Sequence, residues 1–176
     1  MQDEATFDAV DARATRVVQF WELSRKHAGF GKLSAVVGTT FIETVPPEAW
    51  AFGDSPELAD ELLDLVLAGT KTGTASGLIE YEVEGASLPR QGDLSIILDG
   101  AGEPRALIRT TSVAVVPFDE VDAEFARLEG EGDLSLDYWR QEHERYWRRA
   151  LPQIGHEFSP TMNVICETFE LLYPKP

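Results

Sequence analysis

The sequence predicts an α+β fold in which a small, curved sheet is flanked by helices. Apolar residues recur at helical spacing in the segments 9–26, 57–67 and 137–150, which is typical of amphipathic helices. Strand-like segments lie on both sides of the turn signal at 99–102, and a further apolar strand-like segment, 163–171, lies near the end of the chain. Together these patterns favour strands and helices that share one core.

The 176 residues are enough for one domain with a substantial core. We expect residues 1–50 to form a helical extension that packs on a body formed by residues 51–176. Segment 9–26 predicts an amphipathic helix that ends near Gly29. The pair Pro46-Pro47 forbids a regular helix, so the region before the body is expected to be a connection or short strands.

The body is predicted to begin with a helix. Ser55-Pro56-Glu57 combines a capping hydroxyl with Pro at the first helical position, so a helix should run over 57–67 and stop at Gly69. The segment 70–76, rich in Thr and small residues, suits a strand or an extended loop, and 78–83 suits a helical turn.

The second half should supply the main strands and the most aromatic helix. A strand over 94–98 is followed by a partner over 105–116, whose length suggests the bend or bulge found in small barrels. A short acidic helix is expected over 120–128, the aromatic helix over 137–150 and a last strand over 163–171.

Composition and charge restrict the function. Fifteen Lys and Arg against 31 Asp and Glu give a net charge of −16, which repels phosphate backbones at long range. We therefore expect no DNA partner and, among nucleic-acid ligands, a small one rather than long RNA. Cys166 is the only cysteine, which excludes an internal disulfide and a C-x-x-C site and fits a reducing cytoplasm. No apolar run approaches the ~20 residues of a membrane span.

Lys71 is the first candidate for chemistry, because it is isolated among small residues in the segment 69–74. In a cleft of low polarity the pKa of a lysine falls, and the amine then accepts a proton from a hydroxyl such as that of Thr74. In an extended segment, however, these two side chains point to opposite faces unless the backbone bends. The alternative is a solvated lysine beside strand threonines.

An acidic block at 129–135 and the aromatic helix after it are the other candidates. The carboxylates of the acidic block interleave with glycines and suit a charge partner for a lysine, a site for a hard cation, or the capping of the next helix by Asp133 or Ser135. Trp139 and His143 follow at helical spacing, where they either stack on a base or belong to the core. No hydrolase elbow, dinucleotide fingerprint, P-loop or zinc pattern is present, so we expect no cofactor and no metal.

The segments Phe52-Gly53-Asp54-Ser55, Ala68 to Ser76 and Glu129 to Leu136, followed by Tyr138-Trp139 and His143, resemble the bacterial ASCH-domain proteins of the PUA-like superfamily. The resemblance covers about residues 51–173. It implies a PUA-like small β-barrel with flanking helices and a cleft for RNA or a nucleoside-sized ligand.

The resemblance also implies roles for individual residues. In members that are enzymes the lysine of the Gly-x-Lys-Thr block is catalytic, which corresponds to Lys71, with Thr74 as nucleophile. The glutamate that acts with them is Glu129 or Glu131, of which we favour Glu131. Ser135 corresponds to the serine implicated in ribonuclease-like members. Thr72, Arg109, Trp139 and His143 complete the predicted ligand contacts.

Three functions therefore remain open from the sequence. The first is a hydrolase, an N4-acylcytidine amidohydrolase or a ribonuclease, in which Lys71 is the base. The second is a binding module in which the same residues hold RNA or a modified nucleoside without turnover. The third is an acidic interaction protein that engages a basic partner through residues such as Glu120, Asp122 and Glu124. The sequence predicts no membrane partner and leaves the oligomeric state open.

Overall fold

The structure, a computed structural model, describes residues 2–30 and 45–175, with side chains from residue 12 onward. The elements are, in chain order, α1 (Gln2–His27), β1 (Glu48–Trp50), α3 (Pro56–Leu67), β2 (Gly73–Gly77), α4 (Leu78–Glu84), β3 (Leu94–Leu98), β4 (Pro104–Pro117), α5 (Ala123–Glu129), α6 (Leu136–Ala150) and β5 (Asn163–Tyr173), with 3-10 turns at Phe118–Glu120 and Leu151–Ile154. Helices and strands both contribute buried residues, so the chain is of the α+β class, as predicted.

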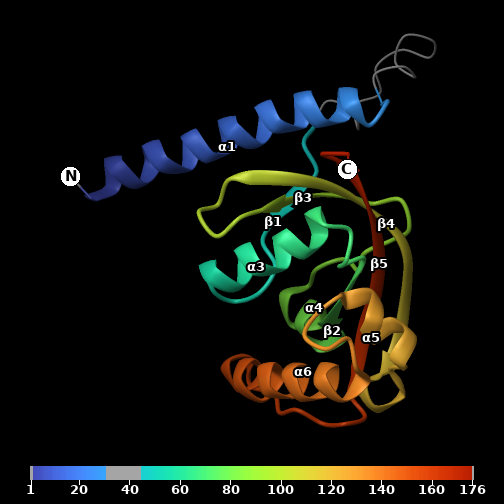
Figure 1. Ribbon diagram of the computed structural model, residues 1–176. Helices are drawn as coiled ribbons and strands as arrows, with labels where there is room; N and C mark the ends of the chain where they lie inside the picture. Colours follow the sequence, from blue (N-terminus) through green and yellow to red (C-terminus); the bar gives the residue numbers. More distant parts are fainter. Residues whose placement is uncertain (1, 31–44, 176) are drawn as a thin grey trace. The chain divides into compact units, whose positions relative to one another are not determined.

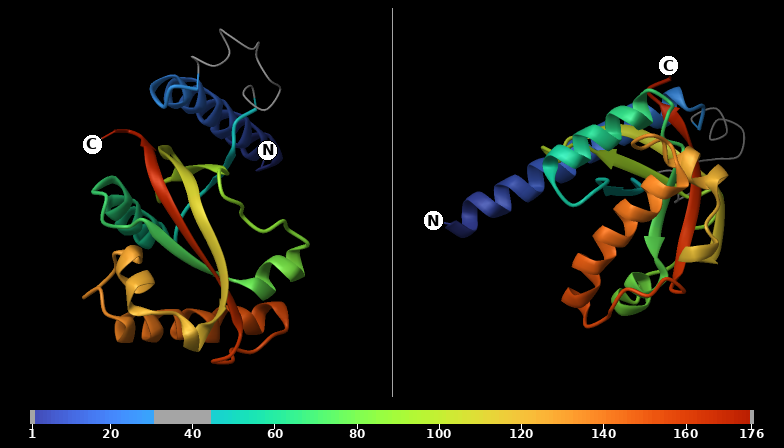
Figure 2. Two further views of the ribbon diagram at one scale, coloured as in Figure 1. Left: turned by 90° about the vertical axis from the view of Figure 1, so that its right-hand side faces the viewer. Right: turned by 60° about the horizontal axis from the view of Figure 1, so that its bottom comes forward.

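Hydrogen bonds link the five strands in the order β1-β3-β4-β5-β2. β1 pairs with β3 in parallel, whereas β3 with β4 and β2 with β5 pair antiparallel. The two long strands β4 and β5 run side by side in both views of Figure 2. β2 is the edge strand beside β5, with Thr74 opposite Glu167 and Ala75 opposite Cys166.

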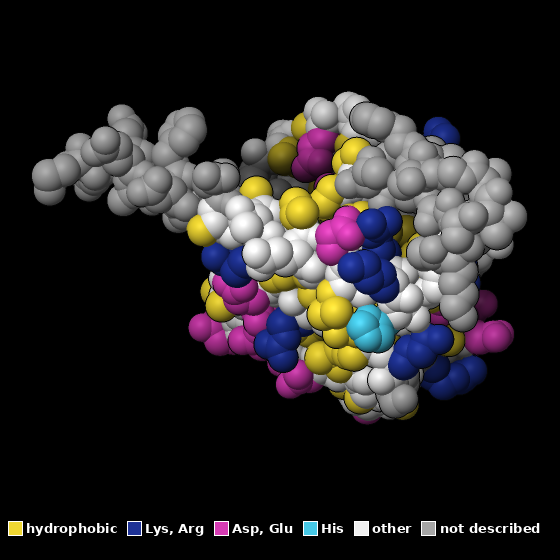
Figure 3. All heavy atoms as spheres, turned by 90° about the horizontal axis from the view of Figure 1, so that it is seen from above, with side chains coloured by type: hydrophobic (Ala, Val, Ile, Leu, Met, Phe, Trp, Pro, Cys, Tyr) yellow, Lys and Arg dark blue, Asp and Glu magenta, His cyan; other side chains and the backbone are white. Residues whose placement is uncertain are grey.

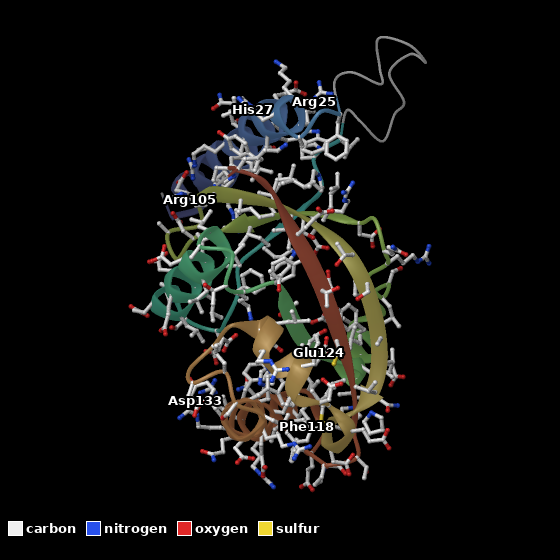
Figure 4. All side chains as sticks on the ribbon, turned by 45° about the vertical axis from the view of Figure 1, so that its right-hand side comes forward. Arg25, His27, Arg105, Phe118, Glu124 and Asp133 are labelled. Atoms are coloured by element: carbon white, nitrogen blue, oxygen red, sulfur yellow. The ribbon has the colours of Figure 1, made fainter. Side chains whose placement is uncertain are left out.

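The chain divides into two compact units. The first is formed by residues 1–67, 94–109 and 171–176, and the second by residues 68–93 and 110–170. In the first unit, Trp21 of α1 packs with Ile96, Leu98 and Leu107 of the sheet. Arg25 and His27, at the C-terminal end of the same helix, are labelled in Figure 4.

The core of the second unit is aromatic. Phe118, Trp139 and Trp147 are buried there together with Val164 and Cys166 of β5. The ring of Phe118 stacks on Trp139 at 5.3 Å between ring centroids and meets Trp147 edge-on at 5.8 Å. Of the two alternatives left open for Trp139, the structure thus supports a core residue, and Trp147 belongs to the same core.

Capping side chains set two helix starts as predicted. The hydroxyl of Ser55 accepts a hydrogen bond from the Leu58 amide at the start of α3, and that of Ser135 accepts one from the Tyr138 amide at the start of α6. Asp133, labelled in Figure 4, accepts a hydrogen bond from the Ser135 amide in the loop that leads into α6.

The irregularity expected in the long strand lies at the start of β4. Ile97 is opposite Ala106 and Leu98 is opposite Pro104, so Arg105 is an extra residue on β4, beside the turn. The Asp99 carboxylate accepts hydrogen bonds from the Ala101 and Glu103 amides, so the turn closes around this side chain. The division of the chain at residue 50 stays a prediction.

Candidate functional site

Lys71 lies at the centre of a buried charge cluster in the second unit. Its side chain is only 1% exposed, and its Nζ donates to Oε2 of Glu129 at 2.9 Å and to Oε1 of Glu131 at 2.6 Å. A further hydrogen bond of 3.4 Å runs from Nζ to the backbone carbonyl of Glu129. Glu129 and Glu131 therefore both bind Lys71. The sequence analysis expected one of these two glutamates to act with Lys71 and favoured Glu131. The four residues Lys71, Glu129, Glu131 and His143 are called the Lys71 cluster below.

Backbone contacts hold the lysine segment against the end of α5. The Thr72 amide donates to the Leu128 carbonyl at 2.7 Å. At Gly130, which ends α5 with φ 73°, a Cβ would lie 2.5 Å from the carbonyl oxygen of Thr70, so only glycine allows this approach. α5 lies beside β2 and α6 in Figure 1, and it places the acidic block over the segment that carries Lys71.

Glu129 is buried and fully paired. Its Oε2 binds Lys71, while its Oε1 accepts from the indole Nε1 of Trp139 at 2.8 Å and lies 3.4 Å from Nε2 of His143. Burial alone would raise the pKa of Glu129, but the charges of Lys71 and His143 outweigh burial, so its pKa is well below the ordinary value. Glu129 is a carboxylate throughout the neutral range.

The same interactions fix the state of Lys71. Burial alone would lower the pKa of Lys71, but Glu129 and Glu131 outweigh it and raise the pKa above 10.5. The sequence-based expectation of a lysine with a lowered pKa is wrong for this arrangement, because two carboxylates reach the amine. As an ammonium, Lys71 has no lone pair with which to accept a proton.

His143 closes the cluster on α6. Its ring stacks on Trp139 at 4.2 Å between centroids, and its Nδ1 lies 2.9 Å from the Trp139 carbonyl oxygen. Burial alone would lower the pKa of His143, but Glu129 raises it above 6.5, which favours the imidazolium near neutral pH. The side chain is 15% exposed.

A small depression lies in front of the cluster. It holds about 200 Å³ of space, including open solvent, and it is lined by Ala126, Glu131, Ser135, Tyr138, Trp139, Glu142 and His143. The lining includes Glu131, Ser135, Trp139 and His143, four residues that the sequence analysis selected from two separate motifs. The volume that a bound group could occupy inside it is only about 10 Å³, room for about one water molecule and far below the 300 to 1,000 Å³ of ordinary ligand pockets, so a larger ligand would contact its rim.

The other predicted residues lie elsewhere. Thr74 lies on β2 opposite Glu167, while its neighbour Ala75 packs into the core beside α5 and α6, so Thr74 points to the other face of the strand. Thr72 uses its hydroxyl to bind the Leu128 carbonyl at 3.4 Å. Arg109 belongs to β4 within the first unit, opposite Leu94.

Three lining residues were not selected from the sequence: Ala126, Tyr138 as a wall of the depression, and Glu142. The sequence contained a signal for Tyr138 and Glu142, because they are four residues apart on α6 and therefore lie on one face of that helix. Glu131 lines the depression together with them. Within the described residues, no three His, Cys, Asp or Glu side chains are grouped as metal ligands, and no helix has the length and apolarity that crossing a membrane requires.

The distribution of charged side chains on the surface bears on the charge of a ligand. Among the described side chains on the face drawn in Figure 3, Lys and Arg are interspersed with Asp, Glu and apolar side chains rather than gathered in one basic patch. In the second unit, the carboxylates of Glu131 and Glu142 line the depression.

Comparisons with known proteins agree with this description. The chain is similar to the crystal structure of protein EF3133 from Enterococcus faecalis, at 34% identity and a TM-score of 0.72, with 90% of this chain and 91% of that chain covered. It is also similar to the crystal structure of an ASCH domain from Lactobacillus crispatus, at 26% identity and a TM-score of 0.70, with 84% of this chain and 95% of that chain covered. No curated protein matches the chain.

These likenesses confirm the predicted fold class, a PUA-like small barrel with flanking helices. The family model of the ASCH domain matches residues 48–173, which is most of the chain and includes the whole Lys71 cluster. The resemblance found in the Gly-x-Lys-Thr block and the acidic block is therefore confirmed. The chain belongs to the ASCH domain family.

Proposed function

We propose that the chain binds a nucleoside-sized ligand whose base lies against the rim of the depression in front of the Lys71 cluster. The observation that carries the proposal is that the acidic block and the aromatic helix, two separate motifs, meet in one depression lined by carboxylates and aromatic rings. Aromatic rings stack on bases, and carboxylates accept hydrogen bonds from exocyclic amino groups. A ligand with an amino-bearing base matches both kinds of group.

The charge of the lining favours a nucleoside over a nucleotide or long RNA. Glu131 and Glu142 both line the depression, whereas the one lysine of the cluster is buried behind Glu131 and neutralised by two carboxylates. A phosphate at this place would meet like charge, and the net charge of −16 repels a phosphate backbone as it approaches.

In this proposal Glu131 is the residue that touches the ligand and Lys71 positions it. The side chain of Glu131 is 23% exposed, whereas that of Lys71 is 1% exposed. The 2.6 Å hydrogen bond from Lys71 fixes one oxygen of Glu131, so the carboxylate is held for binding before the ligand arrives. Ser135 keeps its hydroxyl engaged with the Tyr138 amide, so its part in ligand binding is to shape the rim.

Hydrolysis of an N-acylated base is the second candidate, because Glu131 and His143 both line the depression. Glu131 would take a proton from a water that attacks the acyl carbon. The bond to nitrogen would then break, and the imidazolium of His143 would give its proton to the leaving amine. Lys71 acts here as a positioning residue, since its ammonium cannot serve as the base.

Calorimetric titration with cytidine, cytidine 5′-monophosphate and a short single-stranded RNA tests the binding proposal. We expect cytidine to bind more tightly than the monophosphate, and Glu131→Gln to weaken cytidine binding by about tenfold or more, because a hydrogen bond to a charged group is lost. Glu144→Gln is the matched control, since Glu144 lies on α6, the helix that lines the depression, and pairs with Arg148 outside the depression. Equal affinity of wild type and Glu131→Gln would refute the assignment.

Turnover separates the two candidates. Incubation with N4-acetylcytidine, followed by chromatography, should release cytidine from the wild type and not from Glu131→Gln if the protein is a hydrolase. Binding of the acylated nucleoside without product would leave recognition as the function. Fragments released from the RNA instead would identify a ribonuclease and reject the nucleoside proposal.

A further inference from the structure

Leu134 combines an unfavourable backbone conformation with an exposed apolar side chain. Its φ is 64°, and in the described part of the chain it is the one residue other than glycine with a positive φ. The left-handed region brings the Cβ of an L-residue too close to the following carbonyl oxygen, so a leucine there is strained. Leu134 is nevertheless 40% exposed, so much of its apolar surface remains in contact with solvent.

Two glycines in the same loop are explained by their surroundings. At Gly130 a Cβ would lie 2.5 Å from the carbonyl oxygen of Thr70, and at Gly132, with φ 55°, it would lie 2.4 Å from the ring of Tyr138. Both positions therefore exclude a side chain. Leu134 has the same kind of backbone but carries a large side chain, although glycine would adopt this conformation without strain. The fold alone does not account for the leucine.

Leu134 lies at the edge of the depression. Its amide donates to the Glu131 carbonyl at 3.0 Å, which closes a four-residue turn. The first and last residues of such a turn have Cα atoms within about 7 Å of each other. Glu131 and Ser135, the residue that follows Leu134, both line the depression. Leu134 is therefore close in space to one lining residue and bonded to another.

A base that lies against the rim of the depression needs an apolar surface there. The space inside the depression is about 10 Å³, so a base contacts the rim rather than entering. Among the aromatic side chains of the lining, Trp139 is 3% exposed and offers little surface to a ligand. The faces of a base are apolar, and covering an exposed leucine with such a face removes apolar area from water.

We propose that Leu134 is a ligand-binding residue, whose side chain packs against the face of a nucleoside base on the rim of the depression. The carboxylate of Glu131 then meets the amino group at the edge of the same base, so the two ends of one turn contact two different parts of the ligand. The strained backbone is retained because it presents the leucine at this place. This inference rests on the proposed nucleoside function and adds to it the residue that recognises the apolar face.

The contact is tested directly by nuclear magnetic resonance of protein labelled at its leucine methyl groups, in which the Leu134 signals are those missing from Leu134→Met. Adenosine, whose fused rings carry a large ring current, should shift these signals together with the ring signals of His143, which lines the depression. A shift at His143 without one at Leu134 overturns this inference and leaves the proposed function in place. A shift at Leu134 alone sustains the leucine contact and rejects the depression as the site. No shift at either residue rejects both.

Affinity and stability separate this contact from a structural role. Leu134→Ala and Leu134→Gly should both weaken adenosine binding about five- to tenfold, because both remove the apolar side chain, and Leu134→Met should stay within about twofold of the wild type. Leu88→Ala, at a leucine 37% exposed in the loop before β3, is the matched control and should bind like the wild type. Leu134→Gly should unfold at a higher urea concentration than Leu134→Ala, because glycine relieves the strain that alanine keeps. Wild-type affinity in Leu134→Gly, or a Leu134→Ala protein at least as stable as Leu134→Gly, overturns the inference.

Discussion

Replacing Lys71 with Met should be among the most destabilising single changes in the second unit. Lys71 and Glu129 are 1% and 2% exposed, so water cannot solvate the carboxylate that loses its partner. Removing one member of a buried ion pair costs about 3 to 5 kcal/mol. Glu131 is 23% exposed and regains water, so its share of the loss is about 1 kcal/mol or less. Lys71→Met should therefore lower the free energy of unfolding by about 3 to 5 kcal/mol.

Urea unfolding followed by tryptophan fluorescence measures this loss, because Trp139 donates to Glu129 within the cluster. The double variant Lys71→Met with Glu129→Gln should recover a large part of the stability, since no unpaired buried charge remains. The loss in Lys71→Met should also shrink as the pH falls below 4.5, the ordinary pKa of a glutamate, because Glu129 without its lysine is then protonated. A loss below about 1 kcal/mol, or a double variant no more stable than Lys71→Met, would refute the buried-pair reasoning.

Three further changes probe the same cluster. Gly130→Ala should destabilise the second unit by at least about 1 to 2 kcal/mol in thermal or urea unfolding, because it adds a clash with Thr70 to an unfavourable positive φ. Gly85→Ala, at φ 66° with open space around the added Cβ, is the control, and equal losses in both would reject the close-approach argument. Trp139→Phe removes the indole donor to Glu129 and part of the ring volume, so unfolding should show a loss of at least about 1.5 to 3 kcal/mol, and this loss should be smaller in a Glu129→Leu background, which has no acceptor. His143, with its pKa raised in the folded state, stabilises below pH 6.5 and loses this contribution as the pH rises through the folded-state pKa, so stability should fall with pH in the wild type but not in His143→Gln.

Local sequence signals were sufficient to predict most of the helices, strands and turns. Ser55 and Ser135 cap the helices they were expected to cap, and the Asp99-Gly100 turn joins β3 to β4. These features depend on a few neighbouring residues, so a short window of sequence contains the whole cause. The aromatic core followed from helical spacing in the same way.

The site depended on tertiary contacts that no short window contains. The protonation state of Lys71 depends on how many carboxylates reach its amine. Glu129, at the end of α5, and Glu131, in the loop after it, both do so from about 60 positions along the chain. The expected lowering of its pKa considered only burial, which is one of two opposing effects. The face to which Thr74 points was fixed by the pairing of β2 with β5, and sequence spacing from Lys71 could not supply that register.

The buried Lys71 thus neutralises and orients the carboxylates around it. Lys71 pairs with Glu129, and Glu129 also binds Trp139 and His143, so the lysine segment, the end of α5 and α6 are joined through one carboxylate. The remaining partner, Glu131, is the only one of the two acids that lines the depression. Loss of Lys71 should therefore weaken ligand binding although Lys71 does not line that depression, because Glu131 loses the hydrogen bond that orients it. The binding measurement uses Lys71→Met protein that urea unfolding shows to be folded before urea is added. If it binds cytidine with wild-type affinity, Glu131 is positioned by its backbone alone.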